Sequence, residues 1–215
     1  MSFFGPPPER PPWMPTEPPE WGPPLWDRPA EDTLGVAVAM TLLLARSDES
    51  ALVFDDVRAY PNGFTFGLVT MRNPNLPVDM DRPHLPFHHM ARVGFEFADG
   101  TTVSSEQPVF PPMPGPGFVG RSAAMAISAV GPATGFASPG FDADGVPTGH
   151  SLRPQGGGGS QHHQTMGFWC FRLPPPGTMT IHADMPGHFD EVTVEVDTTP
   201  IIEASSASKV LWERP

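Results

Sequence analysis

The sequence predicts a mainly β fold in which two antiparallel sheets pack together as a sandwich. About seven or eight short segments alternate apolar and polar residues at a period of two, as half-buried strands do. Turn-forming residues separate these segments, and only a stretch near residue 200 is typical of a helix. Strands that follow one another without intervening helices favour antiparallel sheets over a βαβ fold.

The first predicted strands form a continuous group. Residues 36–44 alternate large and small apolar side chains, and a turn at 46–50 ends this run. A helix is an alternative for so short a run, but the alternating segments that follow favour a strand. Residues 51–60 and 63–71 are the next two predicted strands. The Pro61-Asn62-Gly63 sequence between them indicates a hairpin, because Asn and Gly tolerate a positive φ.

Further strands are predicted on both sides of an irregular segment. Residues 93–97 and 101–103 flank Ala98-Asp99-Gly100, where Asp-Gly can supply a tight turn. Regular structure is expected to resume near residue 165, with strands at 166–173, 178–184 and 191–197. The first of these three is apolar on both faces through Met166, Phe168, Trp169 and Phe171. Such a strand is typical of the centre of a sheet that is covered on each side.

A short helix is predicted from about Pro200 to Trp212. Thr199 can cap it, and Pro200 suits its first position because no backbone donor is required there. Ile201, Ser205, Ser208 and Trp212 would share one stripe of that helix.

The chain divides into a tail at residues 1–30 and a β-sandwich domain at 31–215. Eleven prolines interrupt the tail, so an extended conformation is expected there. A Gly/Pro-rich insertion is expected inside the domain at about 105–164, because glycine and proline recur there without a period. The Gly156-Gly-Gly-Gly159 run within it suggests a flexible linker.

Three tryptophans in the tail, Trp13, Trp21 and Trp26, are the candidate binding residues. A purely solvated linker has little use for large apolar rings, so this tail is expected to pack on something. The tail could dock on its own domain, bind another protein or stay disordered. As apolar anchors, the three rings would contact a protein partner.

The charge of the chain excludes several classes of partner. The formal net charge is −12 and Lys209 is the only lysine, which disfavours binding to nucleic acid and to anionic membrane surfaces. The longest apolar stretch, 34–45, is shorter than the roughly 20 residues that a membrane-spanning helix needs. No export signal is recognised at the N-terminus, so a cytoplasmic location is expected. The oligomeric state stays open.

The histidines do not predict a metal site, and no cofactor is expected. His84, His88 and His89 lie close together, and His162-His163 follow the glycine run. Adjacent histidines in an extended segment point to opposite faces, so only one of each pair could join a given site. No Cys pair or His-Glu-x-x-His pattern accompanies them.

Two other features have ordinary structural interpretations. Cys170, the only cysteine, lies between Trp169 and Phe171 and is expected to be a small apolar core residue. Asp142-Ala-Asp144-Gly145 is faintly similar to a calcium-binding loop. It lacks the glutamate that would complete the pattern, so an acidic surface turn is expected.

Several segments in order resemble a group of actinobacterial proteins to which no function is assigned. These segments are the opening Met-Ser-Phe-Phe-Gly-Pro-Pro-Pro-Glu, Ala59-Tyr-Pro-Asn-Gly-Phe64, Phe95-Glu-Phe-Ala-Asp-Gly100, the glycine run and Leu173-Pro-Pro-Pro-Gly177. The resemblance implies a bacterial cytosolic protein and supplies no activity. The strand pattern also looks like the immunoglobulin-like sandwich of some bacterial accessory proteins, an analogy of fold alone.

Two functional hypotheses follow. The first is a non-enzymatic module that binds protein through the Trp/Pro-rich tail or an exposed sheet face. The second is an enzyme or a small-ligand or metal binder whose site lies under the 105–160 segment. Its acid–base or ligand groups would be Asp142, Asp144, His150, His162 and His163.

Replacing Trp169 by Ala should destabilise the domain by about 3–5 kcal/mol, because a large core side chain would leave a cavity. Chemical denaturation of the two proteins measures this difference. Unchanged stability would place Trp169 on the surface.

Overall fold

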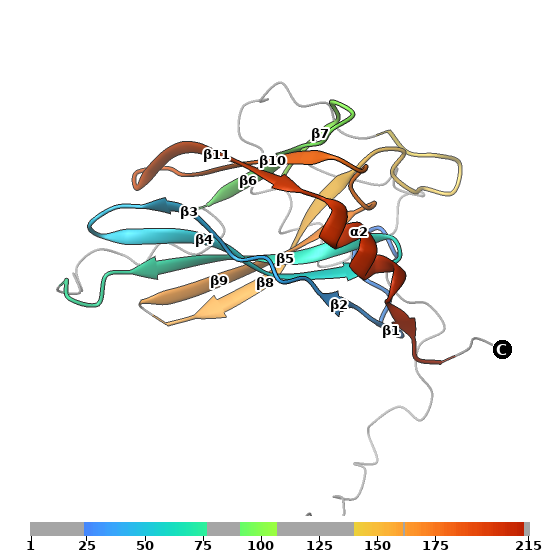
Figure 1. The fold of residues 1–215 in the computed structure, drawn as a ribbon, viewed down its shortest axis with the longest axis horizontal. Coiled ribbons are helices and arrows are strands. Elements are labelled where there is room, and N and C mark those ends of the chain that lie inside the picture. Colours follow the sequence, from blue (N-terminus) through green and yellow to red (C-terminus); the bar gives the residue numbers. More distant parts are fainter. Residues whose placement is uncertain (1–23, 77–90, 107–139, 161, 213–215) are drawn as a thin grey trace, which may run out of the picture.

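The computed structural model describes residues 24–76, 91–106, 140–160 and 162–212. In this part of the chain, two larger antiparallel sheets form separate layers, with one short helix at the side of the molecule (Figure 1). The predicted mainly β, antiparallel fold is therefore confirmed. The immunoglobulin-like topology remains a prediction.

The larger sheet has six strands. Its order is β2 (Val36–Ala37), β4 (Ser50–Tyr60), β5 (Gly63–Arg72), β9 (His163–Phe171) and β8 (Ser151–Gly159), and β3 (Leu42–Arg46) also pairs with β4. β4 and β5 are a local hairpin, whereas β9 reaches β5 from a distant part of the chain. β9 is a central strand, as the sequence predicts.

The smaller sheet has four strands in the order β11 (Phe189–Asp197), β10 (Thr178–Met185), β6 (Arg92–Glu96) and β7 (Thr102–Ser104). The Asp-Gly turn between β6 and β7 is confirmed, and Gly100 adopts a φ of +79°. A third, two-stranded sheet joins β1 (Thr33–Leu34) to β12 (Lys209–Val210).

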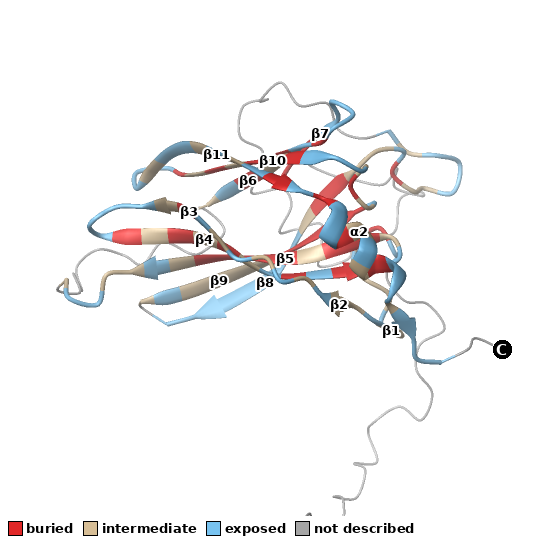
Figure 2. Ribbon diagram, viewed as in Figure 1, coloured by how far each residue is buried: buried red, intermediate tan, exposed pale blue. Residues whose placement is uncertain are grey.

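An aromatic core lies between the two layers, and Figure 2 shows buried stretches on strands of both. Phe66 of β5 is at its centre. Its ring stacks on Phe54 of β4 at 4.7 Å and on Phe168 of β9 at 5.1 Å, and meets Phe95 of β6 edge-on at 5.2 Å. Because Phe95 belongs to the smaller sheet, these contacts hold the two sheets together.

The predicted first strand is broken, and a bulge in β4 explains the break. β4 pairs with β2 through Arg58 and Ala59 and with β3 through residues 51–54, and its register with β5 shifts between Asp55 and Arg58. Asp56 adopts a φ of +49° at this bulge. One straight strand cannot follow both segments of β4, so β2 and β3 form separately.

The prediction of a flexible linker at Gly156–Gly159 is wrong. These residues are half of β8, and they pair with residues 164–167 of β9. Glycine lacks a side chain, but its backbone donor and acceptor still form the ladder when a strand such as β9 is already in place. Regular structure therefore begins earlier than residue 165, whereas residues 107–139 lie outside the described residues.

The C-terminal helix α2 (Thr199–Ser206) is shorter than predicted, and Thr198 is its N-cap. Ile201 and Ser205 are buried, but the chain leaves the helix for β12, so Trp212 is exposed and lies on no helical stripe. Within the described ranges, no helix is long and apolar enough to cross a membrane.

The predicted hairpin at residues 61–63 is present for a different reason than the sequence suggests. Neither Asn62 nor Gly63 adopts a positive φ. Instead, a Cβ atom on Gly63 would lie 2.2 Å from the carbonyl oxygen of Cys170 and 2.7 Å from the Trp169 ring. Glycine is required here because β9 passes too close for any side chain.

Gly63→Ala should therefore lower the free energy of unfolding by about 2–3 kcal/mol, since a backbone carbonyl has to move. Gly158→Ala is the matched control, because its Cβ would meet no atom within 4 Å. Urea denaturation of both variants tests this contrast, and equal stabilities would contradict it.

Candidate functional site

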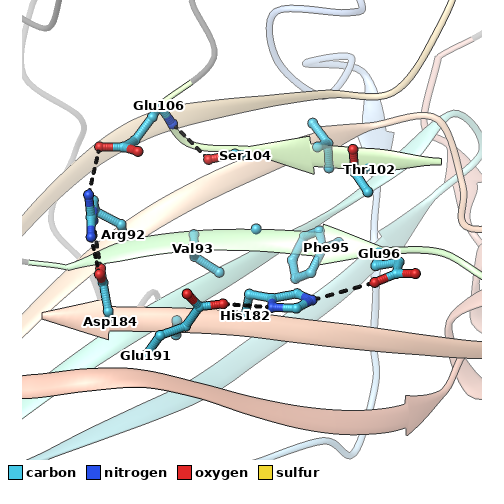
Figure 3. Close-up of a pocket in the computed structure, with 13 residues that line it drawn as sticks. Arg92, Val93, Phe95, Glu96, Thr102, Ser104, Glu106, His182, Asp184 and Glu191 are labelled. Atoms are coloured by element: carbon cyan, nitrogen blue, oxygen red, sulfur yellow. Dashed lines mark hydrogen bonds and ion pairs between the residues drawn. The ribbon is translucent and has the colours of Figure 1, made fainter. Parts of the chain in front are cut away.

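A hollow of about 350 Å³ lies on the outer face of the four-stranded sheet. Strands β6, β7, β10 and β11 all contribute to its lining, and Figure 3 shows the side chains that surround it. It is the candidate functional site of the described part of the molecule.

The hollow exists because a glycine occupies the middle of β6. Gly94 pairs with His182 of β10 on one side and with Ser104 of β7 on the other. Alternation places Arg92 and Glu96 on the same outer face as Gly94, while Val93 and Phe95 are buried in the core. The missing side chain leaves a bare floor between two charged neighbours.

Arg92 bounds one end of the hollow through two carboxylates. Its Nε donates to Asp184 Oδ1 at 2.7 Å and its Nη2 pairs with Asp184 Oδ2, while Nη1 lies 3.3 Å from Glu106 Oε1. The hydrogen bonds to Asp184 raise the pKa of Arg92 further above its usual value. This two-point geometry holds the guanidinium in one orientation.

His182 bounds the side of the hollow formed by β10 (Figure 3). Its Nδ1 lies 3.0 Å from Glu191 Oε1 and its Nε2 lies 3.8 Å from Glu96 Oε2. A carboxylate only accepts hydrogen bonds, so Nδ1 carries the proton that Glu191 accepts. Each ring nitrogen faces a different carboxylate, so these three residues do not converge on one point.

The charge around the hollow is mostly negative. Four carboxylates, one guanidinium and one imidazole line it. Arg92 is already paired at both ends, whereas Glu96 and Glu191 keep more than half of their side-chain surface exposed. The arrangement suits a cationic group that lies on the floor and reaches these carboxylates.

A second feature lies on the outer face of the six-stranded sheet, where Trp26 is only 5% exposed. Its ring packs with Trp169 and Phe171 of β9, and it meets Phe141 edge-on at 5.9 Å. Trp26 thus docks on its own domain, one of the alternatives left open for the tail, and its role in binding a partner stays a prediction. Trp13 and Trp21 lie outside the described residues.

Polar contacts hold the segment around Trp26. Asp27 Oδ1 accepts hydrogen bonds from Arg153 Nε at 2.9 Å and Nη2 at 2.6 Å. Gln155 Nε2 donates to the carbonyl of Asp27 at 2.7 Å, and Asn62 Nδ2 donates to that of Leu25 at 3.2 Å. The guanidinium carbon of Arg153 also lies 5.2 Å from the centre of the Trp26 ring.

The residues of the enzyme and ligand-binding hypothesis do not come together. Asp142 accepts hydrogen bonds from the backbone of Asp144 and Val146, as in an ordinary acidic turn. His150 precedes the end of β8 that pairs with Phe171, and His163 begins β9 at the opposite end, roughly 25 Å away along the strands. Among the described side chains, no group of three or more His, Cys, Asp or Glu is placed to hold a metal ion.

The other predictions have mixed outcomes. Burial raises the pKa of the Cys170 thiol, and the side chain is a core residue as predicted. Phe168, Trp169 and Phe171 are buried, whereas Met166 is only partly so. His84, His88 and His89 lie outside the described residues.

Sequence reasoning missed the hollow. The pattern Arg92-x-Gly94-x-Glu96 is visible in the sequence, as is His182-x-Asp184. Only the register between β6 and β10 shows that Gly94 lies opposite His182, and these strands come from segments on either side of the predicted insertion. A comparison of this chain with protein-family models, curated proteins and solved structures gives no match.

His150 should make the domain less stable in mild acid. It stacks on Phe97 at 4.1 Å, and burial lowers its pKa from 6.5, with Asp99 partly opposing that shift and Arg172 adding to it. The unfolded chain therefore takes up a proton as the pH falls below 6.5 while the folded chain resists it, so stability decreases.

His150→Phe should lose less stability than the wild type between pH 8 and pH 5, as measured by urea denaturation. The pKa values of Asp55, Asp99 and Asp197 are lowered from 3.8, so these carboxylates stay ionised in the folded protein throughout this pH range. Identical pH profiles for the two proteins would contradict the prediction.

Proposed function

We propose that this protein is a non-enzymatic binding module whose contact surface for a protein partner is the outer face of the four-stranded sheet. The observation that carries the proposal is the hollow over Gly94. Among the described residues it is a bare floor on an uncovered sheet face, and ion-paired side chains border it. Polar rims around an apolar centre are the ordinary anatomy of protein interfaces.

The chemistry of the hollow selects a basic side chain of the partner. A lysine or arginine stem would lie over the Gly94 backbone, and its head group would reach Glu96 and Glu191. Long basic side chains bury their methylene stems in this way while the charge stays near water. Arg92 and Asp184 satisfy each other and define one wall. Glu96 and Glu191 also face His182, but more than half of each side chain is exposed, which leaves surface for the ligand to contact.

Exposed ion pairs contribute on the order of 1 kcal/mol or less each, so the charges supply orientation and selectivity rather than most of the affinity. Flanking partner residues would have to supply the remaining contacts on the strands around the hollow. The binding should weaken with salt for the same reason.

Gly94→Leu tests the proposal, because a leucine side chain would enter the hollow without changing any charge. Its Cβ would lie 3.0 Å from the carbonyl oxygen of Val103, so β7 has to shift by a few tenths of an ångström. The probes are fluorescent peptides that differ only in a central arginine, lysine or alanine. The wild type should bind the basic peptides at least tenfold more tightly than the alanine peptide at low salt, and Gly94→Leu should lose that difference.

Gly158→Leu controls for adding a leucine to an exposed strand away from the hollow, since a Cβ at Gly158 meets open space. It should bind as the wild type does. Circular dichroism and melting must first show that both variants fold. Equal binding of all three peptides, or unchanged binding by folded Gly94→Leu, would refute the proposal.

A further inference from the structure

We propose that the residues packed around Trp26 form a receptor site for Trp-Asp segments, and that the chain's own residues 25–27 occupy it in cis. We call this site the tryptophan socket. Its lining residues are Tyr60, Phe141, Val146, Arg153, Trp169 and Phe171. The site is separate from the hollow over Gly94, because it lies on the other sheet.

The residues that surround Trp26 come from the six-stranded sheet and from one turn beside it. Trp169 and Phe171 form its floor from the central strand β9, while Arg153 comes from β8. Tyr60 lies at the end of β4, and its ring meets Trp169 edge-on at 5.7 Å. Phe141 and Val146 come from a turn closed by the Phe141–Pro147 bridge. Residues of β4, β8, β9 and this turn thus surround the cluster that contains Trp26.

The contacts to residues 25–27 are of the kind that recognise a peptide. Asn62 and Gln155 donate to main-chain carbonyls, which any peptide offers. Arg153 contacts two specific side chains, because it pairs with the Asp27 carboxylate and lies near the Trp26 ring. Charge-assisted bonds of this geometry together with an aromatic anchor are typical determinants of binding energy.

The side chain of the residue before the tryptophan is exposed to solvent. The Leu25 side chain is 46% exposed, and its backbone carbonyl accepts the bond from Asn62. A different side chain at this position would therefore meet solvent and not the socket. The recognised pattern is therefore x-Trp-Asp, with any residue at x.

A similar segment, with tryptophan but without the aspartate, occurs once more in the sequence. Pro23-Pro24-Leu25-Trp26 is preceded by Pro18-Pro19-Glu20-Trp21, in which a glutamate replaces the exposed leucine. The residue after the tryptophan differs, since Gly22 stands where Asp27 pairs with Arg153. The contacts of Arg153 therefore explain why Trp26 occupies the socket, and they rank an aspartate-bearing segment above this second copy.

Because the chain's own segment already occupies the site, a simple assay with the wild type and a free peptide would not detect binding. A segment tethered a few residues away acts at an effective concentration in the millimolar range, which a weaker free peptide cannot match. The test therefore uses full-length protein in which the cis ligand is weakened, and the probe is a synthetic peptide with the sequence of residues 23–28.

Full-length Trp26→Ala should bind this peptide with a dissociation constant below about 100 μM in calorimetry, while the wild type binds it at least tenfold more weakly. A peptide with Ala at the tryptophan position should not bind. One with Ala at the aspartate position, and one with the sequence of residues 18–22, should each bind at least tenfold more weakly. Trp26→Ala/Arg153→Ala should lose binding.

A second variant keeps the proposal testable if Trp26→Ala does not fold. Asp27→Ala retains the ring and loses only the pairing with Arg153, so the free peptide should displace the cis segment at lower concentration than in the wild type. Folded variants that do not bind the peptide, or peptides that bind equally well with and without tryptophan, would overturn the proposal.

Discussion

The constraint on which this fold depends is that strand β9 is apolar on both faces. Phe168 and Cys170 belong to the core between the sheets, whereas Trp169 and Phe171 face the other side. A strand of this kind cannot leave either face in water, so the six-stranded sheet needs a cover on its outer side. Trp26 and the turn around Phe141 supply it. Residues 25–27 are therefore part of the folded domain.

The outer faces of the two large sheets differ as a consequence. The six-stranded sheet carries a closed aromatic cluster under the Trp26 segment, while the four-stranded sheet keeps a bare floor at Gly94 between paired charges. Affinity from apolar burial is available on the first face, and charge selectivity on the second. The two proposed sites would thus bind through different interactions, apolar burial on the first face and charge pairing on the second.

Local patterns predicted most of the strands, because alternation and turn residues act over a few neighbours. The hairpin joining β4 to β5 is of this kind. The broken first strand was missed because its cause, the bulge at Asp56, lies in a different strand. The hollow was missed because it depends on the register of Gly94 with His182. For Trp26, composition indicated burial but could not distinguish the chain's own sheet from a partner.

Among the described strands, β8 forms one border of the larger sheet, and its backbone is poorly suited to pairing with another chain. An exposed border strand is a template for aggregation, and proteins commonly blunt it with charges. β8 instead contains Pro154, which lacks a backbone donor, followed by a bulge and by Gly156 at a φ of +112°. A further strand laid along this border would lose its regular ladder there, so the backbone shape of β8 itself disfavours pairing with another chain.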